Sequence, residues 1–334
     1  MRIIAVLLVA GPWAWVAAED SPRSETDAKA ETRSAIAAEI ARLGDARFEV
    51  RETAMQQLGR AGIEAVEPLL AAAQGENLEV TWRATRALGR LIDTDDAARF
   101  AAAERALERL EASGHRAAAR RAVAALETQP EKRWRFALAR FEALGGWAAP
   151  RRDDEQGTPV PTPPPPIILP QYFVVPPDWK GGAAGLANIR RMDSALQTLL
   201  PLDRKLGIYV IDGADVAPQA VDETQNSLRF MEFASRGRAR LGVSFLFDVR
   251  GRGLEVRDIE RDAADATKDA LKRGDLVIKY DGETLTDFDH LTRITRRHDV
   301  GDKLRVEVRR NGEPVESEIE LTGWKKPEIS PKGK

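Results

Sequence analysis

Few side chains in this sequence have the types and spacing that enzymatic chemistry requires. The 334 residues include no cysteine and only three histidines, which are His115, His290 and His298. A catalytic histidine needs a partnered nucleophile, and none of the three lies in a motif that supplies one. Neither Gly-x-Ser-x-Gly nor His-Glu-x-x-His occurs, and no glycine-rich phosphate loop precedes a helix. We therefore expect no catalytic residue, no metal ligand and no cofactor, so that the protein is not an enzyme.

One carboxylate lies in a sequence that is similar to a catalytic motif. Asp212-Gly213-Ala214 is similar to the aspartic-protease motif, but the threonine or serine that should follow the aspartate is missing. That chemistry also needs a second carboxylate, and the chain has no convincing second copy. An unrecognised hydrolase site between Ile167 and Ala234 stays open as an alternative.

A different chemistry, recognition through the main chain, is indicated at residues 241–245. Leu241, Val243 and Phe245 alternate with Gly242 and Ser244, which predicts a strand with one apolar face. Gly242 has no Cβ, so another chain can approach its backbone closely. The other interpretation is an ordinary half-buried strand, and for the apolar residues both can hold.

The residues around this strand predict a small domain of short strands and two helices. Asp281-Gly282 and Asn311-Gly312 are strong signals for tight turns between strands. The predicted elements are strands at 254–259, 276–280, 304–308 and 315–321, a short helix at 263–271, and a helix from Phe288 to His298.

Residues 236–324 resemble a PDZ domain, particularly those that follow the protease domain of HtrA-type serine proteases. The resemblance rests on the Leu-Gly-Val-x-Phe strand, Gly274-Asp275 before a strand, the Asp281-Gly282 turn, the Phe288/Leu291 helix, and Gly301-Asp302 before the strand that ends at Arg-Asn-Gly. One departure is Asp269-Ala270-Leu271, where the family usually has Ala-Gly-Leu.

The resemblance implies that a peptide C-terminus adds as a strand beside Val243 to Phe245. Its carboxylate is then captured by amides near Leu241, Gly242 and Val243, with charge attraction from Arg240. The second helix lines the side-chain pocket. The implied peptide-binding residues are Arg240, Leu241, Gly242, Val243, Ser244, Phe245, Leu291, Thr292 and Thr295.

Residues 31–145 are rich in alanine, leucine and arginine at helical spacing. Val50, Ala54 and Leu58-Gly59-Arg60 recur thirty residues later as Val80, Ala84 and Leu88-Gly89-Arg90, and Ala118, Ala122 and Leu126 form a fainter third copy. This resembles short HEAT-like repeats, in which helix pairs stack on their neighbours. A plain alanine-rich helical bundle is the alternative.

Two further segments connect the repeats to the PDZ-like region. Residues 151–170 carry a proline run from Thr158 to Pro166, which favours an extended linker or loop, with a ligand for an aromatic groove as the alternative. Residues 171–235 have α/β character, with a strand at 206–211 and a helix at 219–227, and resemble an irregular leucine-rich repeat.

The chain's ends and charge bear on localisation and partners. Residues 1–18 have the charged start and short apolar run of a cleavable secretory signal, although an uncleaved anchor is the alternative, and 325–334 form a charged tail. We expect a periplasmic or secreted protein with no stable membrane span after cleavage. The formal net charge is −2 and the arginines alternate with acids, which argues against a nucleic-acid partner.

Together these features predict a multidomain α and α+β protein: helical HEAT-like repeats, a central α/β segment and a C-terminal β-barrel-like PDZ domain. The expected function is a non-catalytic scaffold or adaptor of the cell envelope that binds peptide C-termini or extended segments. The main alternative is an accessory subunit that delivers substrates to an envelope protease or regulates it.

Overall fold

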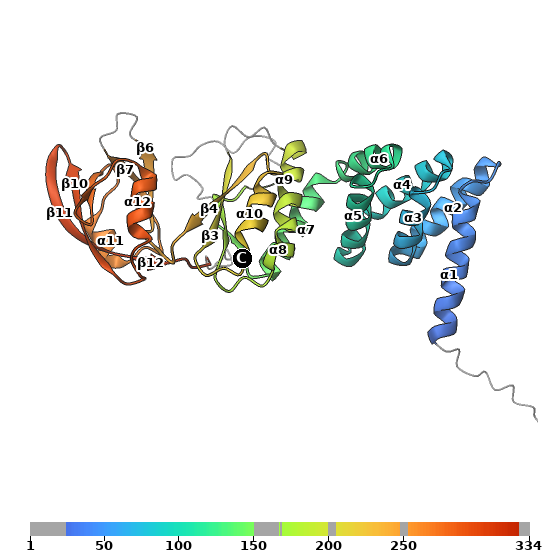
Figure 1. Ribbon diagram of the computed structural model, residues 1–334, viewed down its shortest axis with the longest axis horizontal. Coiled ribbons are helices and arrows are strands. Elements are labelled where there is room, and N and C mark those ends of the chain that lie inside the picture. The colour runs from blue at the N-terminus through green and yellow to red at the C-terminus, as the bar shows by residue number, and fades with distance from the viewer. Residues whose placement is uncertain (1–24, 150–166, 168, 200–204, 248–252, 327–334) are drawn as a thin grey trace, which may run out of the picture. The chain divides into compact units, whose positions relative to one another are not determined.

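The computed structural model describes residues 25–149, 167, 169–199, 205–247 and 253–326. They form two compact units, Met1–Leu126 and Glu127–Lys334 (Figure 1). The expected signal at 1–18, nearly all of the proline-rich segment 151–170 and most of the tail 325–334 lie outside the described residues. Within the described ranges, no helix has both the length and the apolar character needed to cross a membrane.

The first unit is helical throughout. Its elements are α1 (Glu25–Arg42), α2 (Phe48–Ala61), the 3-10 turn η1 (Gly62–Ala65), α3 (Val66–Ala73), α4 (Leu78–Leu91), α5 (Ala97–Glu111) and α6 (Arg116–Leu126). Helices α2, α4 and α6 contact one another in sequence, and so do α1, α3 and α5. This gives two layers of stacked helix pairs, so the predicted helical domain is confirmed, while its assignment to the HEAT-like class stays a prediction.

The recurring residues of the two clear repeats form the core of this unit. Ala54, Leu58, Ala84 and Leu88 are completely buried. The small side chains allow close packing, since a Cβ added to Gly89 would lie 3.2 Å from the Cβ of Ala125 on α6. The Asn77 side chain caps α4 by accepting hydrogen bonds from the Glu79 and Val80 N–H groups. The repeat pattern therefore marks the contacts between neighbouring helices.

The second unit begins with α7 (Pro130–Ala143), followed by an α/β sheet. The sheet has the order β1 (Trp147–Ala148), β2 (Tyr172–Val175), β3 (Leu206–Ile211) and β4 (Met231–Arg236); β2 to β4 are parallel and β1 is antiparallel. Helices α8 (Gly182–Gly185) and α9 (Ala187–Leu199) connect β2 to β3, and α10 (Pro218–Gln225) connects β3 to β4. Residues of α9 and α10 share one apolar cluster with Phe173 and Ile208, so these helices cover one face of the sheet, as expected for right-handed crossovers between neighbouring parallel strands.

Helix α7 packs on α9, although the sequence grouped it with the helical segment 31–145. Trp134 and Phe141 of α7 are buried against Phe173 of β2, with ring centroids 6.0 and 5.9 Å away. A helical pattern alone does not reveal which neighbour a helix will pack against, and these rings fit the α/β core. The opposite face of the sheet carries a second cluster, which includes Tyr172, Tyr209 and Ile211.

The C-terminal part of the second unit is an open sheet with two helices (Figure 1). Its strand order is β11 (Glu313–Glu320), β10 (Lys303–Arg310), β8 (Leu276–Tyr280), β7 (Leu254–Ile259) and β6 (Val243–Phe247), with β9 (Glu283–Thr284) paired to β8. Its helices are α11 (Asp265–Ala270) and α12 (Phe288–Thr295), and β5 (Ala239–Arg240) pairs with β12 (Thr322–Gly323). The predicted strands are confirmed, and the sheet does not close into a barrel.

Local signals placed the turns of this sheet correctly. Asp281 and Gly282 both have positive φ between β8 and β9, as do Asn311 and Gly312 between β10 and β11. After α11, Leu271 leaves the helix in an extended conformation, with φ −103°. Ala270, at the position of the family's usual glycine, is the last residue of α11 and has no positive φ, so Asp269-Ala270-Leu271 needs no glycine there.

Candidate peptide-binding site

The loop between β5 and β6 requires glycine at position 242. Its φ is +72°, and a Cβ there would lie 2.8 Å from the Cβ of Ala263. The Gly242 carbonyl accepts a hydrogen bond of 2.8 Å from the Glu260 N–H, and the Ala263 N–H is bonded to the Glu260 carbonyl. Both the backbone conformation and the close contact therefore exclude a side chain.

Strand β6 leaves one backbone edge unpaired, because in the described parts of the chain it pairs only with β7. Val243, Ser244 and Phe245 are half-buried, and Val243 and Phe245 pack against the domain core. Leu241 is buried in the same core. The free edge offers main-chain donors and acceptors in the alternating pattern that an incoming strand requires.

Helix α12 lies beside β6 through an aromatic contact that sequence reasoning did not assign to the site. The rings of Phe288 and Phe245 have centroids 6.3 Å apart. Thr292, one turn further along α12, is half-buried and donates to the Phe288 carbonyl. The sequence placed Phe288 at the start of this helix, and its aromatic side chain next to the predicted peptide-binding strand was the available signal.

Leu291 and Thr295 of α12 face the domain interior instead. Leu291 is 5% exposed and Thr295 is 6% exposed. The Thr295 hydroxyl donates to the Leu291 carbonyl and lies 3.0 Å from the Tyr280 hydroxyl. Of the three predicted α12 residues, Thr292 is therefore the one with its side chain partly open to solvent.

Arg240 has partners other than the expected peptide carboxylate. It is 7% exposed; its guanidinium donates to Glu260, to Asp262 at 3.2 Å and to the Tyr172 hydroxyl at 3.0 Å. Burial acts to lower the pKa of Arg240, but the Glu260 carboxylate leads the opposing interactions and the net direction is upward. Its positive charge is thus balanced within the protein, which favours the loop's amides as the carboxylate donors.

The site is attached to the second face of the α/β sheet. The Trp324 indole donates to the Gly237 carbonyl at 2.8 Å and packs at 5.5 Å on the Tyr209 ring and 6.1 Å on the Tyr172 ring. The Arg240 guanidinium lies 4.9 Å from the Trp324 ring centroid. The strand that leads into β6 is therefore held against the sheet by aromatic and cationic contacts.

Helix α12 is attached to the same sheet at both ends. The Arg296 guanidinium pairs with the Asp212 carboxylate through contacts of 2.7 and 2.5 Å. At the other end, the Arg236 guanidinium lies 5.7 Å from the Phe288 ring centroid. Asp212 follows β3 and Arg236 ends β4, so the α/β sheet borders the element that stands beside β6.

Residues 239–321 match the PDZ-domain family model. This segment is a PDZ domain. Its bounds begin at β5 and end just before β12, inside the predicted 236–324.

The PDZ domain brings similarity to HtrA-type proteins over part of their length. The chain is 34% identical over 71 residues to a serine protease Do-like HtrA of Lactobacillus helveticus, covering 21% of this chain and 17% of that protein. It is 30% identical over 130 residues to a probable periplasmic serine endoprotease DegP-like of Halomonas elongata, covering 36% of this chain and 26% of the relative. The chain thus spans about a quarter or less of these relatives.

A solved structure with a bound peptide shows a similar partial match. The HtrA-type protease AlgW with tripeptide is 24% identical, with coverage of 28% of this chain and 34% of that chain and a TM-score of 0.25.

His290 of the PDZ domain takes part in polar contacts at the start of α12. His290 lies 3.4 Å from the Thr286 hydroxyl and 3.1 Å from a Glu283 carboxylate oxygen. The Thr286 hydroxyl, however, donates to Asp287 at 2.9 Å, and Asp287 caps α12. Hydrogen bonds from His290 and then Arg297 lower the pKa of Glu283. These contacts form a helix-capping network. The proton of the Thr286 hydroxyl is donated to Asp287 and so is not shared with His290.

The other histidines have structural contacts of the same kind. His298 lies 3.0 Å from an Asp281 carboxylate oxygen. In the first unit, His115 accepts a hydrogen bond from the Ala118 N–H at the start of α6. Within the described ranges, no group of three or more histidine and acidic side chains could hold a metal ion.

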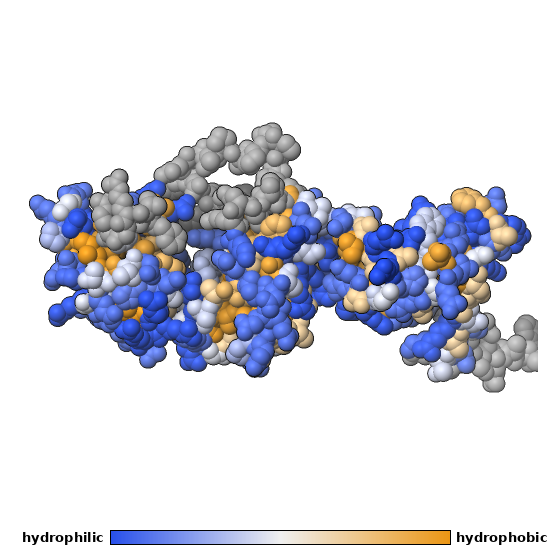
Figure 2. Space-filling model, turned by 45° about the horizontal axis from the view of Figure 1, so that its top comes forward, coloured by the Kyte–Doolittle hydropathy of each residue, from blue (hydrophilic) through white to orange (hydrophobic). Residues whose placement is uncertain are grey.

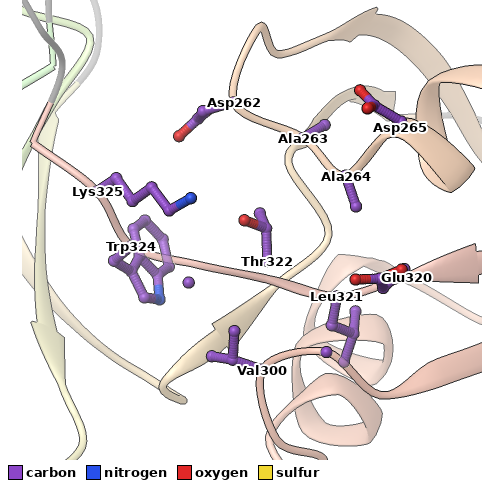
Figure 3. A pocket seen from close by; sticks show the side chains of 12 residues that line it. Asp262, Ala263, Ala264, Asp265, Val300, Glu320, Leu321, Thr322, Trp324 and Lys325 are labelled. Carbon is purple, nitrogen blue, oxygen red and sulfur yellow. The ribbon is translucent and has the colours of Figure 1, made fainter.

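A cavity of about 460 Å³ lies between residues 262–265, residues 300–301 and residues 320–325 (Figure 3). Ala263, which packs against Gly242, lines it together with Val300, Thr322 and Trp324. Figure 3 shows the Lys325 side chain reaching over the same opening as Trp324. None of its lining residues belongs to β6, so this cavity does not extend the β6 edge.

Proposed function

We propose that this protein is a non-catalytic adaptor that binds C-terminal or extended peptide segments by strand addition along β6. The observation that carries the proposal is the unpaired edge of β6 immediately after the glycine loop. The Leu241 and Gly242 N–H groups make no main-chain hydrogen bond outside the strand ladders to any described residue. Those groups are therefore available to a peptide carboxylate.

The direction of the bound peptide follows from this geometry. A carboxylate held at the start of β6 requires a peptide that runs antiparallel to it, with its last residue beside Val243. Main-chain hydrogen bonds to β6 supply affinity, and side chains on one face of the peptide contact Phe245, Phe288 and Thr292. Hydrophilic residues dominate the protein surface in the face that Figure 2 shows, which favours a local strand interaction over a broad apolar interface.

The test is fluorescence polarisation with a dye-labelled random decapeptide pool, offered with free and with amidated C-termini. Free ends are expected to bind more tightly by at least about tenfold, because loss of a charged hydrogen-bonding group costs on the order of 1.5–3 kcal/mol. Gly242→Asp and Thr292→Arg are expected to weaken binding. Thr284→Arg is the matched control, because Thr284 is exposed on β9, away from β6. Equal binding of free and amidated pools would refute end recognition.

The second candidate function is protease-associated: the chain delivers substrates to an envelope protease or regulates it. The similarity to proteins named as HtrA and DegP-like proteases favours it. Purification of the tagged chain from its native envelope would separate the candidates. A co-purifying protease whose cleavage rate changes when the chain is added supports this role, and recovery of assembly or surface proteins supports the adaptor. Export through residues 1–18 to the periplasm is part of both proposals.

A further inference from the structure

Arg236 connects the α/β sheet to the peptide-binding edge through aromatic rings. Its guanidinium carbon lies 4.7 Å from the Tyr209 ring centroid and 5.7 Å from that of Phe288. The Phe288 ring in turn contacts Phe245 of β6. Arg236 lies outside the PDZ domain, and only the Phe288 ring separates its guanidinium from Phe245 on the strand that the peptide would join.

The Arg236 guanidinium has more N–H donors than the one hydrogen bond described for it uses. Arg236 is half-buried, and within the described parts of the chain its side-chain hydrogen bond is to the Ser235 carbonyl at 3.1 Å. The nearby carboxylate of Asp212 pairs with Arg296 instead. Aromatic rings interact with the flat faces of a guanidinium, while a carboxylate binds the N–H groups around its edge. Ring contacts and a carboxylate partner are therefore compatible.

The register of the bound peptide places one of its side chains beside this cation. If the last residue lies beside Val243, the third-last lies beside Phe245, because paired strands advance residue by residue. Directly opposed residues of two strands point to the same face of the sheet. The third-last side chain therefore lies over Phe245 and next to Phe288. A glutamate there can lay its methylene groups on these rings and extend its carboxylate to Arg236.

We propose that Arg236 is a specificity-determining residue that selects peptides with an acidic side chain at the third-last position. This inference rests on the proposed function and names its ligand class: C-terminal segments with glutamate or aspartate two residues before the end. The α/β sheet then takes part in recognition, since it carries the residue that discriminates between peptides.

The experiment uses the full chain and three dye-labelled decapeptide pools that differ only at the third-last residue, which is Glu, Gln or Lys. The unmodified protein is expected to bind the Glu pool about fivefold to tenfold more tightly than the Gln pool and to bind the Lys pool most weakly. Arg236→Gln is expected to abolish the difference between Glu and Gln. Arg236→Glu is expected to reverse the order in favour of Lys, a result that misfolding cannot produce.

Arg238→Gln is the matched control. Arg238 is exposed, lies two residues away, and bonds the Asp212 carbonyl, so its loss is expected to preserve the preference for Glu. A wild-type protein that binds the Glu and Gln pools equally, but only with free C-termini, would overturn this inference and leave the proposed function standing. Equal binding of free and amidated pools would defeat the proposed function itself.

Discussion

The side chains of Arg296 and Asp212 join the helix beside the peptide-binding edge to the α/β sheet through two contacts, Nε to Oδ2 at 2.7 Å and Nη2 to Oδ1 at 2.5 Å. The pair is half exposed, with side-chain exposures of 47% and 38%. Its role is to position α12 more than to stabilise the fold, since such pairs contribute at most about 1 kcal/mol.

Asp212→Asn is therefore expected to lower the free energy of unfolding by less than about 1 kcal/mol. Peptide affinity should fall more clearly, because α12 loses one of its two attachments. Urea denaturation and peptide titration measure the two effects, and a double-mutant cycle with Arg296→Gln isolates the pair. A loss of several kcal/mol in stability with unchanged affinity would contradict this assignment.

Gly242→Ala is expected to destabilise the protein more than Gly274→Ala. Both positions have positive φ, which costs an alanine about 1–2 kcal/mol. At Gly274 nothing lies within 4 Å of the added Cβ, whereas at Gly242 the methyl group would collide with Ala263. We expect a further penalty of about 1–3 kcal/mol at Gly242 in chemical denaturation. Equal losses for the two variants would show that the loop relaxes away from Ala263.

Stability is expected to fall as the pH rises from about 10 to 12. Burial raises the pKa of Tyr172 to about 12, and the interaction with Arg240 only partly opposes it. Because the folded protein holds this proton more tightly than the unfolded chain does, stability is complete below pH 10 and is lost as pH approaches 12. The loss is on the order of 2–3 kcal/mol.

Urea denaturation at several alkaline pH values measures this slope. Tyr172→Phe is expected to make the slope shallower. It should not remove the slope, because burial also raises the pKa of Tyr280. An unchanged slope in Tyr172→Phe would contradict the assignment of this proton to Tyr172.

Trp324→Ala is expected to lower the stability of the second unit by about 2–3 kcal/mol, somewhat below the usual cost for a fully buried tryptophan. The variant loses the ring contacts with Tyr172 and Tyr209 and the hydrogen bond to Gly237. Trp324→Phe keeps an aromatic ring but lacks the donor, so its loss should be about 1 kcal/mol. Thermal unfolding of both variants checks the order. A neutral Trp324→Ala would mean that the ring does not cover the sheet.

In the first unit, Arg83→Met is expected to destabilise far more than Arg109→Met. Arg83 is 4% exposed and pairs with Glu52 on α2 and Glu79 on its own helix. Loss of the cation leaves the partly buried Glu52 carboxylate without its hydrogen-bond donor, at a cost of about 1–3 kcal/mol. The Arg109–Glu67 pair is 60% and 70% exposed, and its loss should cost less than about 0.5 kcal/mol. Chemical denaturation of the full chain, followed by a signal from the first unit, compares the stability of the Arg83→Met and Arg109→Met variants.

Lowering the pH is expected to weaken the ion pair between Arg83 and Glu52. A hydrogen bond from Arg83 leads the interactions that lower the pKa of Glu52. A lowered carboxyl pKa gives stability that is present above the unfolded value and lost as the pH falls through the folded value. Glu52→Gln is expected to weaken the acid dependence of the first unit, and an identical dependence in this variant would contradict the prediction.

Local signals in the sequence predicted most of the PDZ domain. The Asp281-Gly282 and Asn311-Gly312 turns, the alternation at Leu241 to Phe245 and the glycine at 242 all depend on a few adjacent residues. These local signals could not predict contacts between segments that are far apart in the sequence. The partners of Arg240 lie at Tyr172, Glu260 and Asp262, and the contact between Phe245 and Phe288 joins residues 43 positions apart, as 288 − 245 shows.

Helical spacing in the sequence also could not show whether a helix packs against other repeat helices or against a sheet. Helix α7 has the alanine and arginine content of the preceding repeats, yet its Trp134 and Phe141 pack against Phe173. Thr295 was predicted to line the side-chain pocket, a role that stays a prediction; its side chain is 6% exposed and its hydroxyl is hydrogen-bonded to Leu291 and Tyr280. Which face of a short helix is buried depends on the sheet it packs against, which is a property of the completed fold.

The order β2-β3-β4 has a practical consequence for work on fragments. Because both crossovers cover the same side of the sheet, the rings of Trp147, Tyr172 and Tyr209 on the other side depend on Trp324, which follows the last long strand of the PDZ domain. A fragment that stops after β4 would expose these rings to water and is expected to aggregate. Solubility of the middle segment is thus provided by residues nearly a hundred positions downstream, since 324 − 236 is 88.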